Sequence, residues 1–247
     1  MLSNYIDSLD INRKSVSAAH YSAEGNGDVL AVFESLFYDH PGLTGCKGAI
    51  FAAYLILRDL YMAGNKLLIC GNGGSAADAG HIVGELMKGF CKKRPLPERD
   101  QKAITQQYDL WSIEAGAHYC YFGDLGRQLQ GALPAIDLTQ HHALSTAFAN
   151  DVSPKYIYAQ QVHGYGVQGD ALLAISTSGN AENCCAAALI AKAKNMSVIS
   201  LTGPGGGRLG EIADCAIMAP GESTARVQEY HLPVYHTLCA MLEEKMF

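Results

Sequence analysis

Short apolar segments alternate with amphipathic helical segments along most of the chain, and this alternation restricts the fold to one class. Apolar residues recur at helical spacing over residues 29–37 and 47–62, and the apolar run Lys66–Cys70 has the length of a strand. Further strands are expected at 135–138, 171–175, 197–201 and 215–218, and further helices at 76–89, 155–162, 181–193 and 223–244. Short strands between helices predict βαβ units. The sequence therefore predicts an α/β fold in three layers, with helices on both faces of a parallel sheet.

Length and charge narrow the range of functions. The chain has 247 residues, enough for one large domain without requiring a second. Its net charge is −6, and its lysines and arginines form no cluster. Because clustered cations hold nucleic acid, this charge argues against nucleic acid as the main ligand. The negative net charge does not exclude a small phosphorylated ligand, since backbone amides and hydroxyls can hold phosphate.

Cysteine usage and the lack of targeting signals predict a cytoplasmic protein. None of the eight cysteines forms a C-x-x-C pair, and several lie in apolar runs, as expected of buried thiols in a reducing compartment. The first residues lack the basic-then-apolar pattern of a signal peptide, and no run of 18 apolar residues occurs. No membrane partner is expected.

A polar loop between an expected strand and helix is the first candidate binding site. It reads Ser176-Thr177-Ser178-Gly179-Asn180. The free N–H groups and the dipole at a helix N-terminus favour phosphate, and hydroxyls donate further hydrogen bonds. Capping the helix needs one hydroxyl, whereas this loop has three. Its composition favours a phosphate site over a simple cap.

A second loop, Gly71-Asn72-Gly73-Gly74-Ser75, also joins an expected strand to a helix. It matches neither the Walker loop nor the dinucleotide-binding G-x-G-x-x-G pattern, and no nucleotide cofactor is expected. Ligands of parallel sheets bind beyond the carboxyl ends of the strands. The two loops are therefore expected to share one pocket.

Two helices carry titratable side chains. His81 and Glu85 are four residues apart and share one helix face, either as a solvated face or as a functional pair. The closing helix holds Gln228, Glu229, His231 and His236. Two histidines five residues apart do not share a face, so they alone do not predict a metal site.

These motifs together resemble the sugar isomerase (SIS) domain family, and within it the phosphoheptose isomerases, which act on sedoheptulose 7-phosphate. The matching motifs are Gly71–Ser75 with Asp78, His81 and Glu85; Asn150-Asp151; Ser176–Asn180; Gln228-Glu229-x-His231; and His236. The resemblance implies a five-stranded parallel sheet (the SIS fold) and a homotetramer with active sites at subunit interfaces. It places the SIS domain at 45–247, with an insertion at 97–131, after an N-terminal helical arm at 1–44.

The resemblance also implies roles for single residues. Glu85 and His236 would be the catalytic acid–base pair of an aldose–ketose isomerase. Moving a carbonyl between C1 and C2 of a sugar phosphate shifts a proton between carbons through an enediol, and a carboxylate with a histidine suits that task. The substrate would be contacted by Asn72, Gly73, Gly74, Ser75, Asn150, Asp151, Ser176, Thr177, Ser178 and Gln228.

The sequence supports two forms of this site, with and without a zinc ion. In the metal-binding members of the family, zinc is held by residues that match His81, Glu85, Gln228 and His236. Two imidazoles, a carboxylate and an amide oxygen suit zinc. Gln228 and His236, however, are separated by about 12 Å along an ideal helix. A metal-free acid–base pair therefore stays open as the alternative.

The chain departs from the family pattern at three places. Ala181 stands where the phosphate loop normally continues with serine, and Gly89 stands where an arginine often follows the glutamate. The insertion at 97–131 could be a lid, an interface element or surface decoration. It contains Trp111 and Phe122, and because aromatic side chains need burial, a lid or an interface element is favoured.

A rival function comes from another class. A non-catalytic SIS protein could bind a sugar phosphate or act as a scaffold for a protein partner, and such proteins can lose the acid–base pair. Retention of both Glu85 and His236 favours the enzyme.

Overall fold

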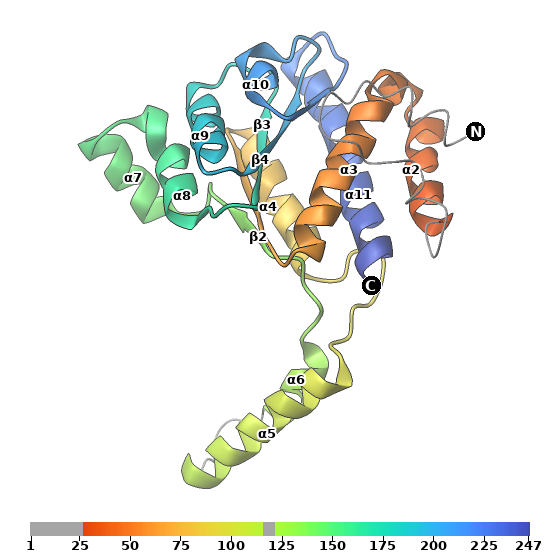
Figure 1. The fold of residues 1–247 in the computed structure, drawn as a ribbon, viewed down its shortest axis with the longest axis vertical. Helices are drawn as coiled ribbons and strands as arrows, with labels where there is room; N and C mark the ends of the chain where they lie inside the picture. Colours follow the sequence, from red (N-terminus) through yellow and green to blue (C-terminus); the bar gives the residue numbers. More distant parts are fainter. Residues whose placement is uncertain (1–26, 116–121) are drawn as a thin grey trace.

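The computed structural model describes residues 27–115 and 122–247 of the chain (Figure 1). Five parallel strands form one sheet in the order β2-β1-β3-β4-β5. They are β1 (Leu67–Gly71), β2 (Ala135–Asp137), β3 (Ala171–Ser176), β4 (Ser197–Thr202) and β5 (Cys215–Met218). The predicted α/β fold with a five-stranded parallel sheet is confirmed.

Helices cover both faces of this sheet (Figure 1). One face carries α2 (Gly27–Asp39), α3 (Lys47–Met62), α4 (Gly74–Met87) and α11 (Thr224–Met246). The other face carries α8 (Ile157–Tyr165), α9 (Glu182–Ala193) and α10 (Gly207–Ile212), and α7 (His142–Asp151) lies outside them. The 3-10 turns η2 (Pro41–Cys46) and η3 (Pro154–Tyr156) precede α3 and α8.

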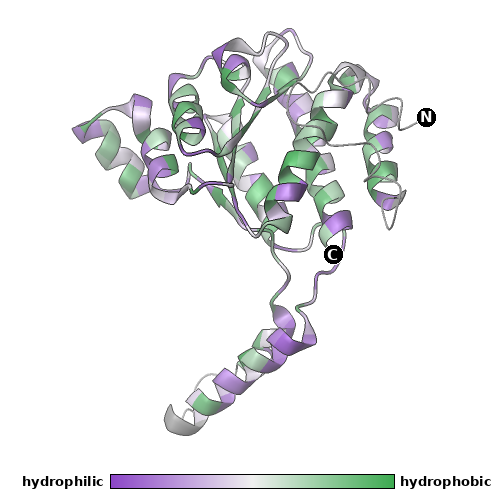
Figure 2. Ribbon diagram, viewed as in Figure 1, coloured by the Kyte–Doolittle hydropathy of each residue, from purple (hydrophilic) through white to green (hydrophobic). Residues whose placement is uncertain are grey.

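The central strands are buried on both faces, which explains their composition. Every residue of β1 and of β3 is buried, so both strands are apolar almost throughout instead of alternating. Figure 2 shows the same hydrophobic interior between the two helical layers. Six of the seven cysteines in the described residues are buried free thiols, as predicted, whereas Cys91 is exposed and Cys120 lies outside those residues.

The helices that follow β1 and β3 lie on opposite faces of the sheet, and this arrangement positions the site. β1 and β3 are neighbours, with Leu67 opposite Ala171 and Gly71 opposite Ile175. β1 leads into α4 on one face, and β3 leads into α9 on the other. Such a switch point opens a crevice at the carboxyl ends of the two strands. The two polar loops singled out in the sequence flank this crevice.

The N-terminal segment that the structure describes belongs to the same core as the domain. Val29, Phe33 and Leu36 of α2 are buried in the cluster that also contains α11. Residues 1–26 of the predicted N-terminal arm lie outside the described residues. Among the helices that the structure describes, none is long and apolar enough to cross a membrane.

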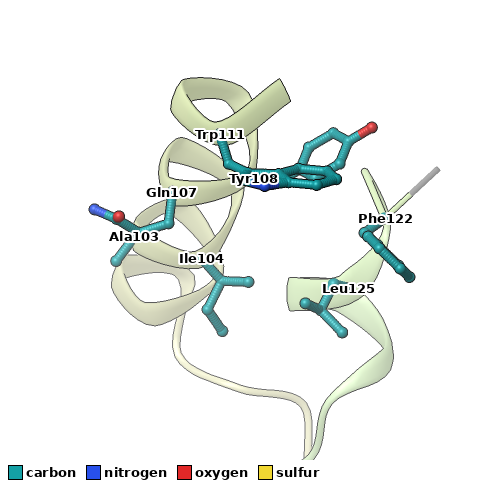
Figure 3. Close-up of a pocket in the computed structure, with 7 residues that line it drawn as sticks. All are labelled: Ala103, Ile104, Gln107, Tyr108, Trp111, Phe122 and Leu125. Atoms are coloured by element: carbon teal, nitrogen blue, oxygen red, sulfur yellow. The ribbon is translucent and has the colours of Figure 1, made fainter. Parts of the chain in front are cut away.

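The insertion forms a helical projection, made of α5 (Glu98–Ala115) and α6 (Leu125–Gln128), that extends away from the domain (Figure 1). Trp111 and Phe122 are 45% and 48% exposed, so this chain alone does not give them the burial that was expected. The reason is that α6 is a single turn and covers little of α5. An open pocket on the projection is lined mostly by apolar side chains: Ala103, Ile104, Gln107, Tyr108, Trp111, Phe122 and Leu125. Figure 3 shows Ile104, Tyr108 and Trp111 of α5 on the side of Phe122 and Leu125.

Candidate active site

The loop between β1 and α4 is fixed by its backbone and by one asparagine. Gly73 precedes α4 with φ +57°, a conformation that favours glycine. The side-chain amides of Asn72 and Asn183 donate to each other's carbonyl oxygen, at 2.9 and 2.8 Å. The Tyr158 hydroxyl donates to the Gly71 carbonyl at 2.6 Å. Asn72 is thereby tied to the start of α9.

The loop between β3 and α9 rests on the loop that precedes α10. The N–H of Leu209 donates to the Gly179 carbonyl at 2.9 Å. Within the loop, Ser178 Oγ accepts the N–H of Asn180 at 3.2 Å. Ser176 is buried, whereas Ser178 is exposed at the mouth of the crevice. The hydroxyls of the loop therefore differ in their access to a ligand.

The sequence reasoning missed a cation beside this loop. The Arg208 guanidinium donates to the Asn180 carbonyl at 2.9 Å, and the Arg208 N–H donates to Asn180 Oδ1 at 3.2 Å. The only sequence signal was an arginine directly after a glycine-rich turn. The amide pair of Asn72 and Asn183 joins the first polar loop to the first turn of α9, which follows the second loop, and Arg208 adds positive charge beside the second loop.

At the other end of α4, three titratable side chains meet. His81 Nε2 lies 3.2 Å from Glu85 Oε1, because a spacing of four residues places both on one helix face. His236 of α11 brings its Nε2 to 3.3 Å from the same His81 nitrogen. The structure thus assembles His81, Glu85 and His236 from two helices that the sequence places about 150 residues apart.

Neighbouring charges and burial change the pKa of His236 in this cluster. Burial, followed by the neighbouring His81, lowers the pKa of His236, and Glu85 offsets part of that effect. The Lys88 ammonium lies 3.4 Å from Glu85 Oε2, on the side away from His81. His236 therefore favours the neutral imidazole, which can accept or pass on a proton.

Tyr235 orients His81 and was not anticipated from the sequence. Its hydroxyl lies 3.0 Å from His81 Nδ1 and donates to Asp78 Oδ1 at 3.3 Å. Burial raises the pKa of Asp78, although Tyr235 and His81 counteract this. With Nδ1 occupied by Tyr235, the other ring nitrogen of His81 faces Glu85 and His236.

Gln228 does not join this cluster. α4 and α11 run side by side in the same direction, so that Tyr235 contacts His81 while the Gln228 amide fills the space beside Gly74. Gly74 precedes His81 by seven residues, about 10 Å along the helix. In residues 27–115 and 122–247, no three His, Cys, Asp or Glu side chains are arranged as a formed metal site. The donor types of His81, Glu85 and His236 nevertheless suit a divalent ion.

Asn150 and Asp151 lie at the C-terminal end of α7, and both are exposed. Asn150 Nδ2 donates to Asp151 Oδ1 at 2.9 Å. The nearby Lys155 pairs with Glu182 in the first turn of α9 at 2.9 Å, which keeps this segment close to the second loop. The hydrogen bonds between Asn72 and Asn183 do not involve Asn150 or Asp151, so the contact of these two residues with substrate stays a prediction.

Comparison with known proteins identifies the family. The SIS domain model matches residues 122–203. The phosphoheptose isomerase of Rhodospirillum rubrum is 34% identical over 204 residues, covering 83% of this chain and 89% of the relative. That of Alteromonas mediterranea is 36% identical over 199 residues, covering 79% of this chain and 82% of the relative.

Solved structures agree with these relatives. The phosphoheptose isomerase GmhA from Neisseria gonorrhoeae superposes with a TM-score of 0.61 at 27% identity, over 92% of this chain and 96% of that chain. A phosphoheptose isomerase from Francisella tularensis gives 0.64 at 28% identity, over 89% and 98%. By sequence and by fold, the chain belongs to the phosphoheptose isomerase family.

Proposed function

We propose that the protein interconverts the ketose and aldose forms of a seven-carbon sugar phosphate, sedoheptulose 7-phosphate, with Glu85 and His236 as its acid–base pair. The observation that carries this proposal is the meeting of Glu85, His81 and His236 across α4 and α11, within 3.2–3.3 Å of one another through His81. The family supplies the substrate, since the relatives are phosphoheptose isomerases.

The chemistry needs two proton transfers that these groups can perform. The Glu85 carboxylate removes a proton from the carbon next to the carbonyl and, after the enediol has formed, delivers a proton to the neighbouring carbon. His236, held neutral, exchanges the proton between the two oxygens. Tyr235 keeps His81 turned toward both groups. A carboxylate with an imidazole beside it thus covers both the carbon and the oxygen steps.

The phosphate end belongs to the crevice between the two loops. The N-terminus of α9 offers free N–H groups, Ser178 offers an exposed hydroxyl, and Arg208 offers a cation. Arg208 offsets the hydroxyl that is missing at Ala181. Holding the substrate by its phosphate orients the reacting carbons and lowers the entropic part of the barrier.

For a divalent ion, the ligands that this chain provides at one place are His81, Glu85 and His236. Gln228 would have to be supplied by a second chain. The ion would polarise the carbonyl when bound. We propose this zinc-bound form beside the metal-free pair, and metal analysis distinguishes them. Purified protein that is stripped of metal should lose activity, regain it with zinc, and fail to regain it when His81→Ala is present. Full activity of the stripped protein would leave only the acid–base pair.

We also propose that the protein works as a homo-oligomer, a tetramer by family resemblance. Support comes from the distance between the acid–base cluster and the polar loop before α4. Glu85 lies eleven residues beyond Gly74 on α4, about 16 Å along the helix. A second chain could then complete each site and supply Gln228. The uncharged apolar face of the projection is the kind of surface that subunits bury. Sedimentation should show an oligomer, and Trp111→Glu should reduce its size if the projection contributes.

A turnover screen tests the activity itself. Ketose phosphates of five, six and seven carbons are incubated with the protein, with and without a chelator, and the aldose products are measured. The seven-carbon substrate should turn over fastest. Binding of all the sugar phosphates without turnover of any would favour the non-catalytic alternative.

A further inference from the structure

Two buried charged residues lie where α4 and α11 end, beyond the acid–base cluster. The side chains of Arg94 and Glu243 are 0% and 1% exposed, and Arg94 Nε lies 2.6 Å from Glu243 Oε1. Arginine and glutamate are almost never fully buried unless they are paired. Each of these two makes further hydrogen bonds, and those bonds lead directly to the cluster.

Arg94 caps the helix that carries Glu85. Its Nη1 donates to the Leu86 carbonyl at 2.8 Å, and its Nη2 donates to the carbonyl of Glu85 itself at 3.0 Å. These carbonyls belong to the last turn of α4, where no intrahelical N–H is available to them. The planar guanidinium serves both carbonyls and the Glu243 carboxylate at once. The backbone at Glu85 is therefore held by a side chain from outside its helix.

Glu243 holds the segment that follows α4. Its carboxylate accepts the backbone N–H groups of Phe90, Cys91 and Lys92 at 2.9, 2.7 and 2.9 Å. Burial alone would raise the pKa of Glu243, but the N–H of Phe90, the Arg94 guanidinium and the N–H of Cys91 together bring it below its ordinary value. The carboxylate is thus an anion at neutral pH, and its hydrogen bonds fix this turn to α11.

The same turn reaches the second catalytic helix at His236. The Phe90 ring lies 5.3 Å from the His236 imidazole, centre to centre. Glu243 and His236 lie on the same helix, seven residues apart, which is about two turns. One ion pair therefore connects the backbone of Glu85, the ring that packs on His236, and the helix that carries His236.

We propose that Arg94 and Glu243 are positioning residues for the isomerase reaction, and that their ion pair sets Glu85 against His236. The proposal rests on the proposed function. Neither side chain touches the cluster itself, so neither is a catalytic residue. Displacing a reacting group by about 1 Å can cost a hundredfold in rate, so a pair that fixes this spacing should affect turnover more than substrate binding.

The chain contains a matched control pair. Lys66 Nζ lies 2.6 Å from Asp170 Oδ2, and the Asp170 side chain is 1% exposed. Asp170 also accepts backbone N–H groups, those of Lys66 at 3.1 Å and Val167 at 2.9 Å. Like Glu243, Asp170 is a buried carboxylate that pairs with a cation and accepts backbone N–H groups, although Lys66 is 26% exposed. This pair joins the amino ends of β1 and β3 instead of α4 and α11.

The experiment compares Arg94→Lys and Glu243→Gln with Asp170→Asn. The first two variants nearly keep the size of the side chain but lose the planar fork or the charge. We expect kcat to fall at least about tenfold while KM changes less than about threefold. Asp170→Asn should lower the melting temperature with kcat within about twofold of the unchanged protein. Should Arg94→Lys not fold, Glu243→Gln carries the comparison.

A second measurement separates this proposal from the proposed function. In NMR spectra, the imidazole C–H resonances of His81 and His236 should shift in Arg94→Lys and Glu243→Gln and stay unchanged in Asp170→Asn. This readout does not depend on turnover. Unmoved resonances, or a loss of kcat that Asp170→Asn reproduces, would overturn the positioning role. No turnover by the unchanged protein would instead overturn the proposed function.

Discussion

His231 shows how a single buried residue constrains the helix that carries His236. Its side chain is fully buried, and its Nε2 lies 3.1 Å from the Thr202 carbonyl at the end of β4. A carbonyl only accepts hydrogen bonds, so Nε2 carries a proton. Nδ1 is buried without a hydrogen-bond partner among the described residues, which favours the neutral ring with its lone pair on Nδ1. His231 thereby fixes α11 to the sheet one turn before Tyr235. Its role is structural, although it belongs to the same motif as Gln228.

The protonation of His231 makes stability depend on pH. Burial lowers the pKa of His231 from its ordinary value of 6.5, and the bond to Thr202 offsets only part of this. The unfolded chain therefore binds a proton that the folded chain does not as the pH falls through 6.5. Stability is full above this pH and declines below it.

This dependence can be measured by urea unfolding. Between about pH 7.5 and 5.5, the free energy of unfolding of the unchanged protein should fall more than that of His231→Gln, which has no proton to gain. Equal losses in both proteins would show that His231 titrates normally in the folded state.

Ser178 allows a prediction about phosphate. Its hydroxyl is at the mouth of the crevice, whereas that of Ser176 is buried. Because a hydrogen bond to a charged phosphate is lost, Ser178→Ala should weaken binding of a sugar phosphate by about 1–3 kcal/mol in calorimetry. Ser35→Ala, at an exposed position on α2, serves as the control and should bind normally. An unchanged affinity in Ser178→Ala would place the phosphate elsewhere.

At the scale of elements, the predicted helices and strands bury an apolar face, whereas two of the missed helices do not. All five strands and the helices α3, α4, α9 and α11 were expected within a few residues of their observed ends. α7 was missed because none of its residues is buried, so no apolar stripe repeats at helical spacing. α5 was missed for the same reason, because its residues are mostly polar and most of them are exposed to solvent.

The loop before α9 makes a prediction at this scale. Gly179 has φ +64°, and a Cβ there would collide with the carbonyl of Gly206. Gly179→Ala should therefore lower the free energy of unfolding by at least about 1–3 kcal/mol and disturb the phosphate site, because both the backbone and the neighbouring loop must shift.

Gly45→Ala is the matched control, since a Cβ at Gly45 meets no atom within 4 Å and its backbone conformation is ordinary. It should unfold close to the unchanged protein. A Gly179→Ala variant as stable as Gly45→Ala would mean that the two loops do not press together as described.

For the whole molecule, the arrangement of the site was only partly predictable. Helical spacing predicts that His81 and Glu85 meet, and the rule for parallel sheets predicts that the two polar loops meet. The approach of His236 to His81 depends on how α4 packs on α11, which the family resemblance implied but no local pattern contains. For the same reason, local patterns could not place Tyr235, Arg208 or the Arg94–Glu243 pair.

The position of the projection relative to the domain is the other feature of the whole molecule that local sequence patterns did not predict. It leaves the domain directly after Arg94, where Pro95 bridges Gln130 and the Gly131 N–H donates to the Arg94 carbonyl at 2.7 Å. The chain therefore re-enters the domain close to the point at which it leaves it. A long insertion is tolerated here because both of its ends are anchored at one point.

The most direct test of the account follows the proton at Glu85. Sedoheptulose 7-phosphate is incubated with the protein in deuterium oxide, and deuterium in the recovered ketose and aldose is measured by mass spectrometry and NMR. The unchanged protein should form aldose and introduce deuterium at the carbon next to the carbonyl. Glu85→Gln should slow both by at least about a hundredfold while its affinity for the sugar phosphate is retained. Normal exchange in Glu85→Gln, or no exchange by the folded unchanged protein, would contradict the account.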